Sequence, residues 1–216
     1  MALSFPLSLA EFFDTLPVAR VTFRLPRSDT FSETGGGELI AHRLGVRLWA
    51  GEIALGRDYH RVWAAIEARL ALLEEPGASF LIRDPRLPGP IADPGGAILG
   101  ASTVRISSLW GDNRQLALKG LPPGYVISRG DLMGFTYGTN PVRYAYHRVV
   151  SGDAADGFGM TGAIEVTPFI RPGAAVNADV TLVAPVLKAR VTGADYGASR
   201  AAIGEGGTFQ WSQTLR

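Results

Sequence analysis

Asp131 raises the first question of chemistry, because it lies in the break between two apolar runs of LPPGYVISRGDLMGF, residues 121–135. A catalytic aspartate needs a partner that shares or orients a proton, and no nearby residue is of that kind. A Gly-Asp pair between apolar strands instead supplies the positive φ and the side-chain-to-backbone bonds of a tight turn. The sequence therefore predicts that Asp131 is the corner of a hairpin. The RGD tripeptide at 129–131 is too short to indicate cell adhesion.

The three histidines, His42, His60 and His147, are too far apart in sequence to predict a metal site. Two histidines that bind one ion usually follow a helix or strand spacing, as in H-E-x-x-H. We expect each imidazole to be hydrogen-bonded inside the protein or exposed at its surface. It stays open that the fold brings histidines from distant segments together. The absence of cysteine removes disulfides, thiol nucleophiles and thiolate ligands together.

The remaining motifs also favour turns over chemistry. GDAADGFG, residues 152–159, places Asp153 and Asp156 three apart with no closing glutamate, which fits a calcium loop poorly and predicts a hairpin loop. TGGG and PGGAILG match neither phosphate-binding nor dinucleotide-binding loops, and no G-x-S-x-G elbow occurs. No catalytic, cofactor-binding or metal-binding residue is assigned, so the chain is predicted not to be an enzyme and to need no cofactor.

Aromatic side chains gather in FTYG and RYAY, which GTNP joins into a predicted hairpin. Phe135 and Tyr137 share one face of their strand, and Tyr144 and Tyr146 share one face of the next. Cross-strand aromatic pairs stabilise sheets, which is the favoured interpretation. An exposed row made of Tyr137, Tyr144 and Tyr146 would instead stack on sugars of a host-surface glycan.

Two periodic segments show which elements must position these residues. In VARVTFRL, residues 18–25, Val21, Phe23 and Leu25 alternate with polar residues, which predicts a half-buried strand. In DYHRVWAAIEARLALLEE, residues 58–75, Asp58 is expected to cap an amphipathic helix that Pro76-Gly77 ends. The apolar stripe of this helix consists of Tyr59, Val62, Trp63, Ile66, Leu70 and Leu73.

The segment between the first strand and the helix is less regular. PRSDTFSETGGG, residues 26–37, is predicted to be a loop by composition. A second strand is expected at about 43–55, with Leu44, Val46 and Leu48 alternating and a bulge or bend near Gly51. A third strand is expected at 79–84.

Many short β candidates follow the proline-rich stretch PRLPGPIADPGG, which cannot form a sheet interior or a helix. Their close spacing predicts a sandwich or barrel. The fold class is therefore mainly β: a β-sandwich domain with one helix at 58–75, and a second, inserted β-sandwich or barrel domain. The expected division is 1–92 with 183–216 for the first domain and 93–182 for the second. The expected core anchors are Phe23, Trp49, Trp63, Ile66, Leu70 and Trp211, with Phe209, Trp211 and Leu215 on one face of the last strand.

Composition narrows the classes of partner. Charged residues make up 19% of the chain, below the roughly 25% of ordinary soluble domains. A charge-poor surface is expected where neighbouring subunits cover it, although a large core would explain it as well. With 21 basic and 20 acidic residues, nothing suggests a nucleic-acid or membrane surface. No signal peptide or run of about 20 apolar residues is present, so assembly in the cytoplasm is expected.

The order strand, glycine loop, strand with LWAGEIAL, amphipathic helix and FLIRDPR resembles the N-terminal part of tailed-bacteriophage distal tail proteins. The second half is similar to a segment of phage minor tail proteins of siphophage type. In that segment a G-L-P turn and a Gly-Asp hairpin precede a strand that closes on V-x-P-x-x-R, here Val166, Pro168 and Arg171, and an A-P-V-L-K-like strand follows. The resemblance covers most of the chain, through turns and strand patterns.

The resemblance implies a structural role in the virion, at the tail tip or baseplate, with assembly in the host bacterial cytoplasm. It implies a homo-oligomeric ring, six copies in the family, that joins the tail tube protein to the hub and receptor-binding proteins. It also implies a ring-forming β domain and an outer domain inserted into it. The small, glycine-rich stretch at 192–207 departs from this pattern and suggests an arm that orders in the assembly.

Two other functions stay open at this point. One is a carbohydrate-binding module that acts in host-surface attachment, based on the tyrosine-rich hairpin. The other is a hydrolase of the cell envelope, based on Asp131, Glu165 and His147. A ring subunit is the favoured hypothesis.

Overall fold

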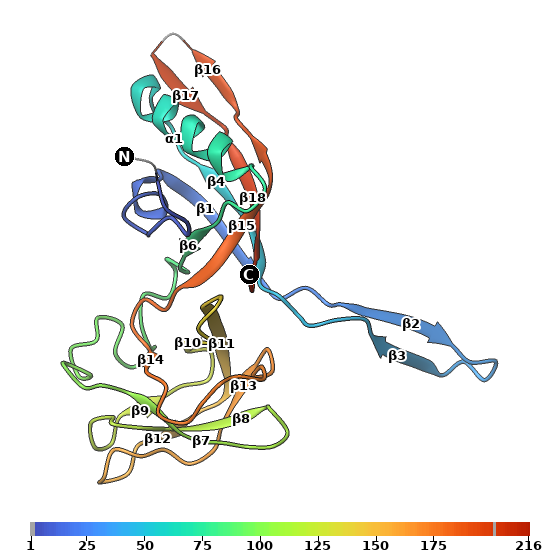
Figure 1. Cartoon of the computed structure of the whole chain (residues 1–216), viewed down its shortest axis with the longest axis vertical. Coiled ribbons are helices and arrows are strands. Elements are labelled where there is room, and N and C mark those ends of the chain that lie inside the picture. The colour runs from blue at the N-terminus through green and yellow to red at the C-terminus, as the bar shows by residue number, and fades with distance from the viewer. Residues whose placement is uncertain (1–2, 201) are drawn as a thin grey trace.

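The computed structural model describes residues 3–200 and 202–216, and in them the chain is mainly β with one α-helix. Two large sheets occupy opposite ends of the molecule, and a long two-stranded hairpin extends sideways from between them (Figure 1). The predicted fold class, a β-rich chain with a single helix and curled or barrel-like sheets, is confirmed.

The first sheet is antiparallel and draws its five strands from both halves of the chain. In order across the sheet they are β1 (Val18–Arg24), β4 (Ala50–Leu55), β18 (Thr208–Gln213), β15 (Leu187–Asp195) and β6 (Phe80–Ile82). The chain therefore leaves this sheet after β6 and returns to its centre with β15 and β18. Leu215 was expected to face the core, but β18 ends at Gln213, and Gln213 takes the inward position after Phe209 and Trp211.

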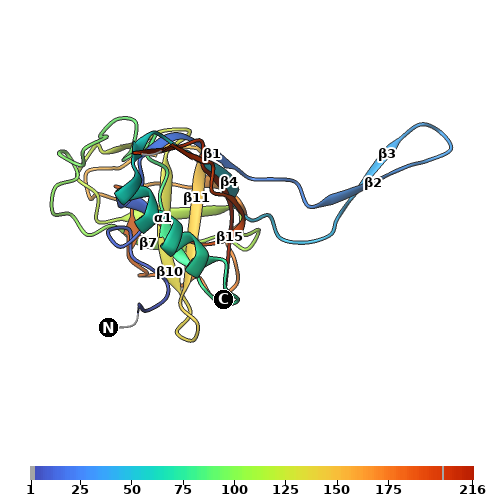
Figure 2. The ribbon, with the colours of Figure 1, turned by 90° about the horizontal axis from the view of Figure 1, so that it is seen from above.

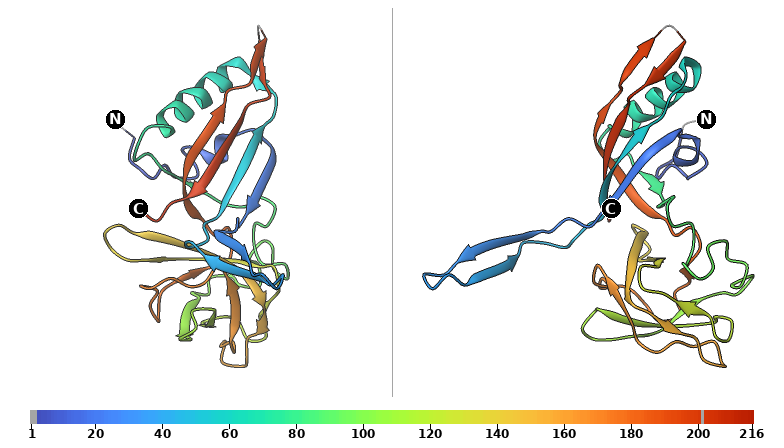
Figure 3. Two further views of the ribbon diagram at one scale, coloured as in Figure 1. Left: turned by 90° about the vertical axis from the view of Figure 1, so that its right-hand side faces the viewer. Right: turned by 180° about the vertical axis from the view of Figure 1, so that it is seen from behind.

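One face of this sheet carries the helix α1 (His60–Leu73), which buries Trp63, Ile66, Leu70 and Leu73 (Figure 3, left). The prediction that Asp58 caps the helix is wrong. Asp58 belongs to the short strand β5 (Asp58–Tyr59), which pairs with β17, so Tyr59 becomes the N-cap and provides no side-chain capping bond. Tyr59 and Val62 of the predicted stripe are exposed because the first helical turn lies at the sheet margin.

The second sheet is formed wholly by residues between β6 and β15. In order across the sheet its six strands are β14 (Val180–Thr181), β10 (Leu132–Tyr137), β11 (Arg143–Ser151), β13 (Ile164–Thr167), β8 (Gln115–Lys119) and β7 (Arg105–Leu109). A small pair, β9 (Val126–Ile127) with β12 (Asp153–Ala154), lies beside it. The proline-rich stretch before it forms turns and no strand, as its composition predicts.

Two further segments differ from their predictions. Residues 26–37 were expected to be a loop, but β2 (Asp29–Glu33) and β3 (Leu39–Arg43) form a regular hairpin. Residues 43–55 were expected to be one strand, but Arg43 ends β3 and the next strand, β4, begins only at Ala50. Leu44 and Val46, between these strands, are exposed. Gly51 does not mark a bulge. It lies where a Cβ atom would overlap the backbone of Thr22 and the ring of Trp211.

The described residues of the glycine-rich stretch, 192–200 and 202–207, form regular structure within the chain itself. The stretch continues β15 and then forms β16 (Ala198–Arg200) and β17 (Ile203–Glu205), and β17 pairs with β5 next to the helix. Tyr196 fixes it further through a 2.6 Å bond from its hydroxyl to the Glu74 carboxylate. An arm that orders in the assembly was expected here, whereas its described residues form strands within a single chain.

Buried apolar side chains form two clusters, one under each large sheet. The six expected core anchors are all buried in the first cluster, together with a short 3-10 turn, η1 (Phe13–Thr15). Two side chains of the second sheet, Leu132 and Tyr146, also belong to the first cluster. The predicted boundaries at 92/93 and 182/183 stay a prediction about independently folding units.

Candidate interaction surface

The feature that most distinguishes this molecule is the long hairpin, which we define as residues 29–43. It projects well away from both sheets (Figures 1 and 2; Figure 3, right). Its strands pair in a continuous register from Asp29 opposite Arg43 to Glu33 opposite Leu39. Its root, residues 25–28 and 44–47, joins it to the rest of the molecule, and Arg43 at the end of β3 also contacts the ring of Phe169.

Local chemistry explains why these residues form a hairpin. Thr34 closes the tip, because its backbone N–H and its hydroxyl oxygen both bond to the backbone of Glu38. Gly37 adopts a φ of +81°, which glycine allows without strain. The glycine run TGGG, with apolar Phe31 before it and Leu39 and Ile40 after it, is the local signal for a turn between two short strands.

The long hairpin is exposed on both faces and along both edges. All residues of β3 are exposed, and Leu39 retains 63% of its accessible surface while Phe31 retains 47%. In the described chain no third strand pairs with β2 or β3, so both outer rows of backbone donors and acceptors are free. An isolated two-stranded hairpin is marginally stable in water, and a free apolar edge is a template for another chain.

The root holds the long hairpin to the body through arginine bonds to backbone carbonyls. Arg47 donates from Nε to the carbonyl of Pro26 and from Nη2 to that of Leu25. Arg171, from the loop after β13, donates from Nη2 to the carbonyl of Arg47 at 3.1 Å. These bonds tie the two segments of the root to each other and to the loop after β13.

The three tyrosines considered for sugar binding do not form an exposed row. Tyr137 and Tyr146 point to opposite faces of the second sheet, and both are buried. Burial raises the pKa of each phenol, which reflects the loss of water around it. Only Tyr144 is partly exposed. Packing explains these aromatics, and the observation on which a glycan site was based is removed.

Asp131 lies in a turn, as predicted, but this turn is not the corner of a hairpin, because β9 before it pairs with β12 and β10 after it pairs with β11 and β14. Asp131 is also buried and holds a second segment. Its carboxylate accepts 2.7 Å and 2.8 Å bonds from the backbone N–H groups of Ser128 and Ile91. The first closes the turn, and the second ties down the proline-rich stretch 40 positions earlier in the chain. Both carboxylate oxygens are therefore committed to structure.

The three histidines lie apart from one another. His42 is exposed on β3, His60 is exposed at the start of α1, and His147 is buried on β11. His147 Nδ1 lies 2.8 Å from the carbonyl oxygen of Pro168, and its ring stacks on Phe135. Because a carbonyl only accepts, Nδ1 carries the proton of the neutral ring.

The acidic candidates are likewise used in turns and ion pairs. Asp153 accepts from the N–H of Gly162, and Asp156 accepts from those of Phe158 and Met160. Glu165 pairs with Arg114. Among the described residues, no three histidine, aspartate or glutamate side chains come close enough to hold a metal ion. The structure thus brings none of Asp131, Glu165 and His147 together as a hydrolase would require.

No protein-family model matches this sequence, and no curated protein matches it significantly. In the part of the chain that the structure describes, no helix has both the length and the apolar character needed to cross a membrane.

Proposed function

We propose that this chain is a structural subunit of a phage tail tip of siphophage type, which assembles with copies of itself into a ring. In this role it joins the tail tube protein to the hub and receptor-binding proteins. The proposal combines the resemblance of the sequence to distal tail proteins with the long hairpin, whose exposed apolar side chains and free edges call for a partner.

The long hairpin carries the proposal physically. A closed ring repeats one interface by rotation, so a projecting element on one subunit must meet a different surface on the next. A hairpin with two free edges can add to the sheet of a neighbour through backbone bonds, while Phe31, Leu39 and Ile40 supply apolar contacts. Obligate interfaces commonly bury more than about 2,000 Å² in total, and an extended element contributes area efficiently.

The rest of the molecule is consistent with a structural role, in which contacts between subunits carry the function. Asp131, Asp153 and His147 bond to backbone groups, Glu165 pairs with Arg114, and the four side chains lie on separate elements. The described surface thus offers a projecting contact element and no constellation of reactive groups. Function then lies in the geometry of contact with the neighbours above and below the ring.

The test is the mass of the purified protein in solution, measured by light scattering and native mass spectrometry. We expect a closed oligomer, six copies by the resemblance, for the natural chain. Replacing Phe31 with aspartate places a charge where the neighbour would cover an apolar surface, so we expect Phe31→Asp to shift the protein to monomers. Its thermal unfolding should stay within a few degrees, because Phe31 contributes little to either buried cluster.

Phe158→Asp is the matched control, since Phe158 is 91% exposed on a loop of the second sheet. We expect this variant to keep the oligomer. A natural chain that stays monomeric from micromolar to high concentration, alone and with tail tube or hub protein, contradicts the proposal. Equal loss of the oligomer in both variants contradicts the assignment to the long hairpin.

A further inference from the structure

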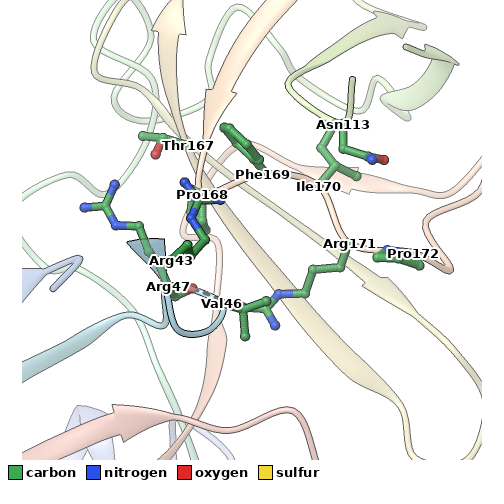
Figure 4. A pocket seen from close by; sticks show the side chains of 10 residues that line it. All are labelled: Arg43, Val46, Arg47, Asn113, Thr167, Pro168, Phe169, Ile170, Arg171 and Pro172. Carbon is green, nitrogen blue, oxygen red and sulfur yellow. Dashed lines mark hydrogen bonds between the residues drawn. The ribbon is translucent and has the colours of Figure 1, made fainter. Parts of the chain in front are cut away.

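A pocket of about 190 Å³ lies between the root of the long hairpin and the loop after β13 (Figure 4). Arg43, Val46 and Arg47 line it from the hairpin side, and the loop lines it with Thr167 to Pro172, including Arg171. Asn113 adds a side-chain amide from the turn between β7 and β8. The hairpin side and the loop are at least 120 positions apart in the sequence, so the pocket exists only in the folded chain.

The pocket is cationic, and the described chain does not neutralise it. None of its lining residues is acidic, and neither Arg43 nor Arg171 forms an ion pair with any described carboxylate. Burial lowers the pKa of the Arg171 guanidinium, although this side chain stays protonated at any physiological pH. Holding a half-buried charge without a counter-charge costs free energy, which a bound anion offsets.

The arginines that line the pocket keep N–H groups that are free to bind an anion. Arg171 spends Nη2 on the carbonyl of Arg47, and Arg47 spends Nε and Nη2 on the root. Arg43 lies over the ring of Phe169, 5.0 Å from its centroid, an arrangement that leaves the in-plane N–H groups available. Guanidinium forks match the geometry of oxyanions, and bidentate pairs with them are among the strong hydrogen bonds.

We propose that this pocket binds a phosphate group, either as free phosphate or as the end of a phosphomonoester. Three arginines favour a group with a charge near −2 over a single carboxylate. Arg114 also lies over the Phe169 ring, at 5.9 Å, so with two guanidinium groups on that ring it is not a free platform for a nucleobase. This inference is separate from the ring and stands on the pocket alone.

The position of the pocket gives the ligand a structural consequence. Arg43 belongs to β3 and Arg47 to the root, whereas Arg171 belongs to the second sheet's loop. A phosphate bound in this pocket joins the hairpin to the body at a place where the protein itself supplies three positive charges and one bond, from Arg171 to the carbonyl of Arg47. Bound phosphate should therefore protect the root against local unfolding.

Isothermal titration calorimetry at constant ionic strength, with inorganic phosphate and with glycerol 3-phosphate, tests the proposal on the full chain. We expect saturable binding to one site per chain. Arg171→Gln removes one fork and should weaken binding about tenfold or more, the effect of losing roughly 1.4 kcal/mol or more of charge-assisted bonding. Tighter binding of glycerol 3-phosphate than of phosphate would identify an ester as the ligand, and equal binding would identify free phosphate.

Arg43→Gln provides a second variant, since Arg43 is exposed on the long hairpin and its replacement leaves the root bonds intact. It should also weaken binding several-fold. Arg190→Gln, an exposed arginine of β15, is the control and should bind like the natural chain. The proposal is overturned by absence of saturable binding, by binding as strong as that of the natural chain in both Arg43→Gln and Arg171→Gln, or by binding of a single-stranded oligonucleotide without binding of phosphate.

Discussion

His147 has two ring nitrogens in unlike surroundings within the buried side of the second sheet. Nδ1 bonds to the carbonyl of Pro168, whereas Nε2 is buried and has no hydrogen-bond partner among the described residues. Burial lowers the pKa of His147 to about 4, the bond to Pro168 opposes this shift, and the nearby charge of Arg171 adds to it. The folded protein therefore keeps this imidazole neutral at pH values where a free histidine takes up a proton.

This surrounding predicts a specific loss of stability in acid. Between about pH 6.5 and pH 4 the unfolded chain binds a proton at His147 and the folded chain does not, so the free energy of unfolding falls as pH falls. The full interval corresponds to about 3 kcal/mol. His147→Asn keeps an N–H donor for Pro168 and removes the titration. We expect the free energy of unfolding, measured with urea at pH 7, 6, 5 and 4.5, to decrease less steeply with falling pH in this variant.

Carboxylates also titrate in this pH range, so the test is the difference in free energy of unfolding between the natural chain and His147→Asn at each pH. His60→Asn is the matched control, because His60 is exposed. It should follow the natural chain at every pH. If His147→Asn and the natural chain show parallel curves, His147 is not the group responsible.

Among the elements, the contact between α1 and the β17 segment shows why the C-terminal stretch contains so many glycines. A Cβ atom on Gly204 or on Gly207 would overlap the indole ring of Trp63. The helix places Trp63 flat against the backbone at these positions, and burial of such a ring is worth several kcal/mol. The glycine-rich composition, which suggested an unordered arm, is therefore a packing surface for the helix.

We predict that Gly204→Ala destabilises the fold by about 1–3 kcal/mol, the usual cost of overpacking a filled site. Urea unfolding followed by the tryptophan signal measures it. Gly193→Ala is the control, because Gly193 has open space around the position of a Cβ atom and ordinary backbone angles. It should change stability by less than about 0.5 kcal/mol. Equal effects of the two substitutions would show that the Trp63 contact is not the cause.

In the molecule as a whole, one junction couples the two sheets. Trp49 donates from Nε1 to the carbonyl of Tyr146 at 2.8 Å, and the two rings meet edge to face with centroids 5.5 Å apart. Gln213 bridges the same region, since its amide nitrogen donates to the carbonyl of Tyr144. Arg148 lies over the Trp49 ring at 5.1 Å. A side chain of the second sheet thus completes the core of the first.

This junction predicts cooperative unfolding of the chain in a single transition. Tyr146→Ala should cost about 3–5 kcal/mol, as for other large buried rings, and should separate the unfolding of the two sheets. Calorimetry together with hydrogen exchange detects the separation. Tyr144→Ala, on the same face of the same strand but only partly buried, should cost less and leave one transition. A loss below 1 kcal/mol in Tyr146→Ala would contradict coupling through this ring.

Local patterning was enough to predict part of this structure. The alternation of β1, the stripe of α1 and the many short strands of the second half each reflect a face that must be buried, and burial is repeated at the period of the element. The core side chains Phe23, Trp63 and Trp211 follow from the same rule. Turn chemistry likewise indicated that Asp131 closes a turn, because Gly-Asp favours that backbone wherever it occurs.

Tertiary structure decided everything that depends on which segments meet. The long hairpin was hidden by its polar and glycine-rich composition, since neither of its faces is buried in this chain and no burial period marks it. Tyr137 and Tyr146 are buried on opposite faces of the second sheet, which requires a packed layer on each side of that sheet. The arginine pocket brings Arg47 and Arg171 together from 124 positions apart, and no local periodicity reports a contact of that range.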